Sequence, residues 1–163
     1  MKYLFLLRHA KSSWSDSTLA DRDRPLNKRG QRDAPKTAKR LASQSIKPDL
    51  ILSSPALRAL TTAQIMATAL GFSSSDIRLE EGIYEASTAQ LLKIIQELDN
   101  SFSRIMLVGH NPGFTNLLNQ IDDVRVDNVP TCGLAMLSFD IDNWCAAEIS
   151  QATLISFDYP KKW

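Results

Sequence analysis

The sequence predicts a three-layer α/β/α sandwich with a mainly parallel central sheet. Three short apolar runs, at residues 3–7, 50–52 and 104–108, are continuous, and helical patterns separate them. Continuous runs are typical of strands that helices cover on both faces, and strand–helix alternation is typical of parallel sheets. We expect residues 1–163 to form one domain, because the length suits a single core and no linker or repeat divides it.

Composition excludes several classes of protein. Hydrophobic residues make up 44% of the chain, charged residues 23%, and the net charge is +1. This balance predicts an ordinary core and no nucleic-acid or membrane partner. The first apolar run ends at Arg8, so it is too short for a signal peptide or a membrane span. Cys132 and Cys145 lack metal-type spacing, and we expect a cytoplasmic protein with two reduced thiols.

The first half of the chain shows two helical segments. The polar residues 10–26 predict a long loop, and apolar residues at helical spacing predict a helix over 27–44. Pro35 lies inside this pattern and marks either its true start or a kink. After the strand at 50–52, Ser54 followed by Pro55 predicts the start of a helix that ends at Gly71.

The second half repeats the alternation. We expect a short strand at 77–79, helices at 88–98 and 114–121, and a strand at 104–108 between them. The last strands are expected within 134–139 and 147–157. They are predicted to pair around a turn near residues 140–143.

Both histidines of the chain directly follow predicted strands. His9 comes after the first strand and His110 after the strand at 104–108. Arg8 ends the first strand, and Arg58 lies in the first turn of the helix after the second strand. In open α/β sheets ligands bind at the carboxyl ends of strands, so we expect these four side chains to meet at one edge.

Such a cluster of cationic groups points to an anion. Repulsion costs about 4 kcal/mol for each close pair of charges at an effective dielectric constant of about 20. The arginine fork matches phosphate oxygens, and a helix N-terminus near Ser54 would add backbone donors. The sequence has no P-loop, no metal-ligand spacing and no GxSxG motif. A phosphate pocket with a histidine nucleophile remains.

Four segments resemble the histidine phosphatase superfamily, and in particular its small SixA-type phosphohistidine phosphatases. Leu7-Arg8-His9-Ala10 is similar to the Arg-His-Gly signature, with Ala10 in place of glycine. The other three are Asp23 to Gly30, Ser53 to Ala59, and Val108 to Gly113. They resemble the "RPL…RG" element, the second-arginine segment and the second-histidine segment. The matches span residues 4–134 in the family's order.

The resemblance implies a mechanism and a set of roles. His9 would accept the phosphoryl group and lose it to water, while Arg8, Arg58 and His110 would neutralise the phosphate oxygens. No metal or organic cofactor is expected. The substrate would be a phosphorylated protein, for example a phosphohistidine domain, or a small phosphorylated molecule.

Several assignments stay open at this stage. Glu85 lies where larger family members carry a general acid, but some SixA-type members lack one, and a solvated loop carboxylate is the alternative. Arg24 and Thr131 are candidate substrate-binding residues; an ion pair and turn chemistry are the respective alternatives. Arg29 is expected to pair with Asp21, Asp23 or Asp33, and Lys11 to be a rim charge.

Two other functions compete with hydrolysis. One is a non-catalytic phosphate-binding module of the same fold, which would not require His9 beside Arg8. The other is a small-molecule phosphatase or a mutase-like phosphotransferase. The chain seems short for the insertions that enclose the substrate of a mutase, and so hydrolysis is favoured.

Overall fold

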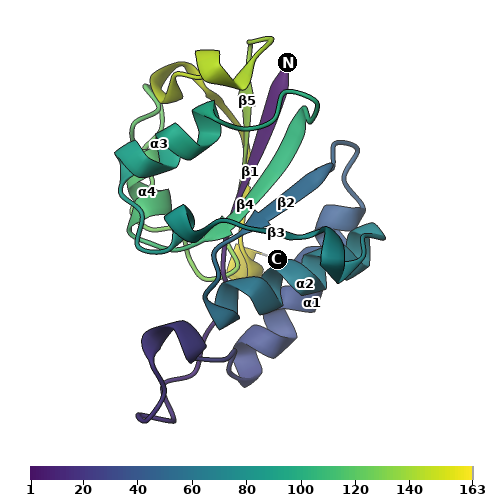
Figure 1. The fold of residues 1–163 in the computed structure, drawn as a ribbon, viewed down its shortest axis with the longest axis vertical. Coiled ribbons are helices and arrows are strands. Elements are labelled where there is room, and N and C mark those ends of the chain that lie inside the picture. Colours follow the sequence, from purple (N-terminus) through teal and green to yellow (C-terminus); the bar gives the residue numbers. More distant parts are fainter. Residues whose placement is uncertain (163) are drawn as a thin grey trace.

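The structure, a computed structural model that describes residues 1–162, is built on a six-stranded sheet of order β3-β2-β4-β1-β5-β6 (Figure 1). Its strands are β1 (Lys2–Arg8), β2 (Leu50–Ser53), β3 (Arg78–Leu79), β4 (Arg104–Gly109), β5 (Leu134–Phe139) and β6 (Thr153–Asp158). The first four run parallel, whereas β5 and β6 are antiparallel to their neighbours. The sheet is therefore mixed, with its parallel part at the centre.

Helices cover both faces of this sheet. Helices α1 (Lys28–Ala42) and α2 (Leu57–Leu70) lie on one face, and α3 (Thr88–Gln96) and α4 (Gly113–Leu118) on the other (Figure 1). Strand β1 shows why both layers are needed. Phe5 and Leu7 belong to the core under α1 and α2, whereas Leu4 and Leu6 belong to the core under α3 and α4. The predicted three-layer fold is confirmed.

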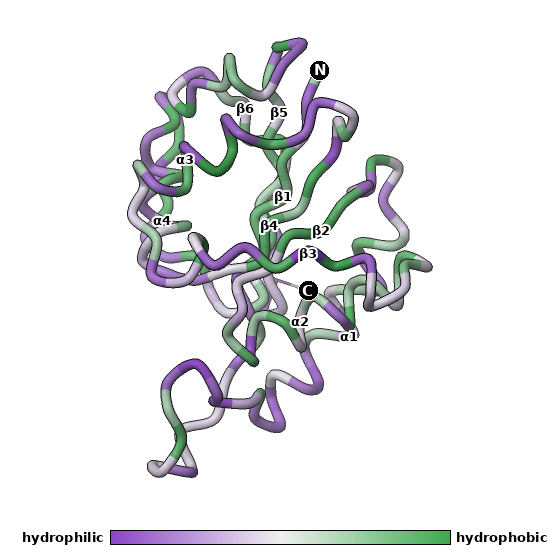
Figure 2. Tube along the Cα trace, viewed as in Figure 1, coloured by the Kyte–Doolittle hydropathy of each residue, from purple (hydrophilic) through white to green (hydrophobic). Residues whose placement is uncertain are grey.

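The apolar strands lie at the centre of the molecule and hydrophilic segments at its periphery (Figure 2). Burial of each large apolar side chain stabilises the fold by about 1.5–3 kcal/mol. No helix among residues 1–162 is both long and apolar enough to cross a bilayer.

The prediction that Pro35 marks the start of its helix is wrong. Helix α1 begins at Lys28, and the Oδ1 atom of Asn27 accepts a hydrogen bond of 2.9 Å from the Gly30 amide. Asparagine is a strong N-cap because its side-chain oxygen satisfies one of the free amides of the first turn. Pro35 therefore lies inside the helix, where its nitrogen has no hydrogen to donate.

The predicted start of α2 is also wrong. The helix begins at Leu57, and Ala56 occupies the cap position without a side-chain bond. The Ser54 hydroxyl instead accepts from the amide of Ala56 at 3.2 Å, which makes a local turn ahead of the helix. The end at Gly71 is confirmed, since its φ of 80° is the left-handed conformation that favours glycine.

The last two strands pair as predicted but are not joined by a tight turn. Two short 3₁₀ turns, Trp144–Ala146 and Ile149–Gln151, precede β6. The Trp144 side chain is fully buried and donates a 2.8 Å hydrogen bond to the Phe102 carbonyl. The connection therefore packs onto the core before the chain enters the sheet.

The long polar loop after β1 projects from the body of the molecule (Figure 1). A β-bridge between Ser12 and Leu26 closes its base. It contains a short 3₁₀ helix, η1 (Asp21–Asp23). The loop brings Asp21 back to the first turn of α2, where it contacts Arg58.

Candidate active site

Parallel pairing of β1 with β4 brings the two histidines together. The register sets Arg8 opposite Gly109, and the His9 amide donates a 3.0 Å hydrogen bond to the Gly109 carbonyl. Each histidine leaves its strand at this edge, and their ring centroids lie 5.2 Å apart. Arg58 reaches the same edge from the first turn of α2, which follows the neighbouring strand β2. The structure thus brings Arg8, His9, Arg58 and His110 to one edge of the sheet.

His9 has one ring nitrogen in a fixed role. Its Nδ1 atom lies 2.7 Å from the Ala10 carbonyl oxygen. A carbonyl can only accept, so Nδ1 carries the proton and Nε2 carries the free lone pair. Burial lowers the pKa of His9 to about 3, against the opposing bond to Ala10; His110, Arg58 and Arg8 lower it further. His9 is therefore neutral at physiological pH, as an attacking imidazole must be.

The backbone around His9 is held from two sides. The Ala10 amide donates to Thr62 Oγ1 at 3.0 Å, and the Thr62 hydroxyl donates to the Arg58 carbonyl at 2.8 Å. The Cys132 amide bonds to the carbonyls of Arg8 and His9. Ala10 is fully buried and its φ is not positive, so the position accepts a Cβ where the family signature has glycine.

Three buried polar atoms of this cluster have no hydrogen-bond partner: Arg8 Nε, Arg58 Nε and His110 Nδ1. An unsatisfied buried donor costs about 1–3 kcal/mol. Native proteins keep such groups mostly where a ligand satisfies them. The other contacts hold the side chains in place: Arg8 Nη1, for example, donates to the Val129 carbonyl at 2.8 Å. The free atoms are therefore suited to an oxyanion.

His110 is held differently from His9. Its Nε2 atom lies 2.7 Å from the Ser54 hydroxyl, which can donate or accept. Burial lowers the pKa of His110 to about 4, with Arg58 as the next cause and Asp21 opposing. The edge of the Tyr84 ring packs 5.5 Å from the imidazole, centroid to centroid. His110 is neutral without a ligand, and a bound phosphate dianion would favour its charged form.

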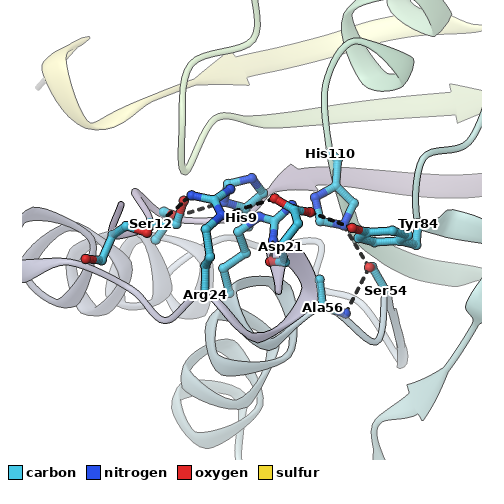
Figure 3. Close-up of polar contacts among 11 residues, drawn as sticks. His9, Ser12, Asp21, Arg24, Ser54, Ala56, Tyr84 and His110 are labelled. Atoms are coloured by element: carbon cyan, nitrogen blue, oxygen red, sulfur yellow. Dashed lines mark hydrogen bonds and ion pairs between the residues drawn. The ribbon is translucent and has the colours of Figure 1, made fainter. Parts of the chain in front are cut away.

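Asp21 is a member of the cluster that sequence reasoning missed (Figure 3). Its carboxylate pairs with Arg58 at 3.1 Å and with Arg24 at 3.1 Å, and accepts a hydrogen bond from the Tyr84 hydroxyl. The bond from Tyr84 is the first cause of an Asp21 pKa lowered to about 2, with Arg58 and Arg24 contributing against partial burial. Partial burial and Asp21 raise the pKa of Tyr84 to about 12. No motif or spacing marks an acidic residue in a polar loop as a contact of this kind.

Glu85 lies in the region of the cluster but not among its buried groups. A cavity of about 470 Å³ opens at the edge of the sheet, and its lining includes Asp21, Arg58, Tyr84, Glu85 and His110. Glu85 is exposed, and its φ of 55° places it in the left-handed region, which is uncommon for a residue with a side chain. His9 is 7% exposed and is not among the lining residues, so the cavity stops short of it.

The two candidate substrate-binding residues lie near the cluster in different environments. Arg24 is buried; it donates to Ser12 Oγ at 2.9 Å and to Asp21, and its guanidinium lies 3.4 Å from the centre of the Trp14 ring. Thr131 is half-buried and directly precedes Cys132, whose amide bonds to the strand end at Arg8 and His9.

Arg29 lies outside the cluster. It pairs with Asp33 at 3.5 Å, as the sequence predicted for one of its three acidic neighbours. Within residues 1–162, no three or more His, Cys, Asp or Glu side chains are grouped as a metal site would require.

Comparison with known proteins identifies the family. Residues 4–108 match the histidine phosphatase superfamily (branch 1). The chain belongs to this superfamily. Among curated relatives, this superfamily member is 35% identical over 149 residues to an uncharacterised chloroplastic protein of Arabidopsis thaliana, a match that covers 86% of the chain and 68% of the relative. It is 28% identical over 165 residues to an uncharacterised protein of Mycobacterium tuberculosis, covering 95% of the chain and 100% of the relative.

Solved structures of the superfamily show a SixA-like likeness. A candidate phosphohistidine phosphatase SixA from Agrobacterium tumefaciens superposes with a TM-score of 0.82 at 32% identity, over 98% of both chains. A protein histidine phosphatase SixA complexed with tungstate shares the fold with a TM-score of 0.81 at 20% identity, over 98% of both chains. The resemblance predicted from four sequence segments is confirmed, and membership supports a phosphatase activity.

Proposed function

We propose that this superfamily member is a SixA-like phosphatase that hydrolyses a phosphoramidate or phosphomonoester through a phosphohistidine on His9. The observation that carries the proposal is the bond between His9 Nδ1 and the Ala10 carbonyl. It leaves the Nε2 lone pair free on an imidazole that burial keeps neutral. A non-catalytic phosphate-binding module has no need of such a group beside its arginines.

The reaction consists of two displacements at phosphorus. His9 Nε2 attacks, a P–N bond forms, and the bond to the leaving group breaks with the electron pair going to that group. Water then attacks the phosphohistidine, the P–N bond breaks, and His9 regains its lone pair while inorganic phosphate departs. The unpartnered donors of Arg8 and Arg58, together with His110, stabilise charge on the phosphoryl oxygens in both steps.

The leaving group determines how far an acid is needed. An alkoxide is a poor leaving group and requires a proton, whereas an imidazole leaves as a neutral base with less help. Glu85 is the candidate acid, and it is exposed at the edge of the cavity rather than buried beside the nucleophile. This position favours phosphohistidine or aryl phosphate substrates. Arg24 and Thr131 are the residues we assign to contacts with the rest of a phosphorylated protein or small molecule.

A substrate panel without added metal tests the proposal. Phosphate release from p-nitrophenyl phosphate, a phosphohistidine peptide, a phosphoserine peptide and a sugar phosphate would be compared. We expect hydrolysis of the first two to exceed that of the others. Binding of all four without release of phosphate from any would contradict the proposal and favour a binding module.

A further inference from the structure

Asp21 binds the same donors that the proposed function reserves for a phosphate. Arg58 donates through Nη2 to the Asp21 carboxylate at 3.1 Å and through Nη1 to its backbone carbonyl at 2.7 Å. Arg24 donates through Nε to the other carboxylate oxygen at 3.1 Å. Two guanidiniums and a phenol hydroxyl therefore surround this carboxylate, and such donor sets also bind phosphate oxygens.

The contacts of Arg58 leave its bidentate edge half occupied. The Nε and Nη2 hydrogens of a guanidinium point the same way and together grip two oxygens of one oxyanion. In Arg58 the Nε atom is buried without a partner, while Nη2 is bound by Asp21. A phosphate that uses both nitrogens must displace the carboxylate from Nη2.

Asp21 is placed so that it can be displaced. Its side chain is 45% exposed, compared with 7% for that of Arg58. It lines the cavity together with Arg58 and His110, and it belongs to a projecting loop rather than to the sheet or a long helix. Rotation into water exchanges a half-exposed ion pair for solvation, which costs little.

We propose that Asp21 is an internal competitor for the phosphate group, holding Arg58 and Arg24 until substrate arrives and lowering the affinity for the phosphate product. This inference rests on the phosphate pocket of the proposed function and adds a residue that sets its affinity. The carboxylate keeps the buried guanidiniums paired in the free enzyme. It regains them as phosphate leaves, and so favours release.

The variant Asp21→Asn separates competition from positioning. Asparagine keeps the shape and one acceptor oxygen but removes the charge. The backbone carbonyl of residue 21 still holds Arg58, and Ser12 Oγ and the Ser13 carbonyl still hold Arg24. The arginines therefore stay in place while the competing anion is lost.

Asp23→Asn is the matched control. Asp23 lies in the same 3₁₀ helix and is exposed, and no ion pair joins it to Arg24 or Arg58 within residues 1–162. The substitution changes the net charge by the same amount. Any effect of overall charge on anion binding will therefore appear equally in both variants.

The test is calorimetric titration of the three proteins with inorganic phosphate. We expect Asp21→Asn to bind phosphate about tenfold more tightly than the wild type, and Asp23→Asn to bind like the wild type. Equal or weaker binding by Asp21→Asn would overturn the inference while leaving the proposed function intact. If neither the wild type nor Asp21→Asn bound phosphate, the proposed pocket itself would be wrong, and the inference with it.

A structure with tungstate bound gives an independent readout. The inference predicts that Arg58 Nε and Nη2 contact the oxyanion and that the Asp21 carboxylate has left Nη2. A bound oxyanion with the Asp21–Arg58 ion pair still closed would overturn it.

Discussion

The imidazole rings of His9 and His110 lie 5.2 Å apart, yet each is held by a different kind of partner. His9 bonds to a carbonyl, which fixes one tautomer, whereas His110 bonds to a hydroxyl, which allows either. The first arrangement suits a nucleophile that must always present a lone pair. The second suits a group that gains a proton when a dianion binds.

The bond between His110 and Ser54 can be tested by Ser54→Ala. The substitution leaves His110 Nε2 without its partner, so the ring loses its orientation. We expect kcat/KM to fall about tenfold and stability to fall by about 1–3 kcal/mol, the usual cost of an unsatisfied buried group. Ser53→Ala is the control, because the Ser53 hydroxyl is also buried but donates to the Ser54 carbonyl. A Ser53→Ala variant as impaired in catalysis as Ser54→Ala would argue against a specific role for the His110 contact.

The two histidines predict acid sensitivity of the fold. Their pKa values fall from about 6.5 in an unfolded chain to about 3 for His9 and about 4 for His110. Between these limits the unfolded chain binds more protons, so stability decreases as the pH falls, by about 1.4 kcal/mol per pH unit for each fully titrating group.

Denaturant unfolding between pH 6.5 and pH 5 measures this effect, because the chain has no other histidine. We expect His9→Gln and His110→Gln each to reduce the pH dependence by about half. A wild-type stability that does not change over this range would show that the buried histidines are not held neutral.

Much of the fold and of the cluster was predictable from local patterns. Continuous apolar strands required two covering layers, and parallel strands ending in Arg8-His9 and Gly109-His110 required a shared edge. Both follow from the sequence because neighbours along the chain determine them. The early start predicted for α2 failed because the Ser54 hydroxyl bonds to Ala56 and His110 instead of capping the helix, and the His110 contact comes from another strand.

Asp21 and Tyr84 could not be found in the same way. Their contact depends on how the projecting loop folds back over α2, and no periodicity records that path. Tertiary contacts between a loop and a distant segment have no sequence spacing of their own. The exposed position of Glu85 at a left-handed residue was hidden for the same reason.

Glu85→Gln tests whether this residue is a general acid. If it is, hydrolysis of an alkyl phosphate should slow by about 10²–10⁴, the usual contribution of such a group. Hydrolysis of a phosphohistidine peptide should barely change, since its leaving group needs little protonation. Kinetics on both substrates provide the comparison. Small and equal effects would mean that Glu85 is a surface carboxylate.

Metal removal tests the source of positive charge. The proposed mechanism uses Arg8, Arg58 and His110 to neutralise the phosphoryl oxygens, so dialysis against EDTA should leave kcat unchanged. Loss of activity that a divalent cation restores would contradict this assignment.

The central claim is that His9 carries the phosphoryl group. Rapid quenching of the wild type with a phosphorylated substrate, followed by mass spectrometry of its peptides, tests it most directly. The account predicts an acid-labile, alkali-stable phosphate on the peptide that contains His9. It also predicts no label and no turnover in His9→Ala, which should still fold. Turnover by a folded His9→Ala variant, or a phosphate trapped on another residue, would contradict it.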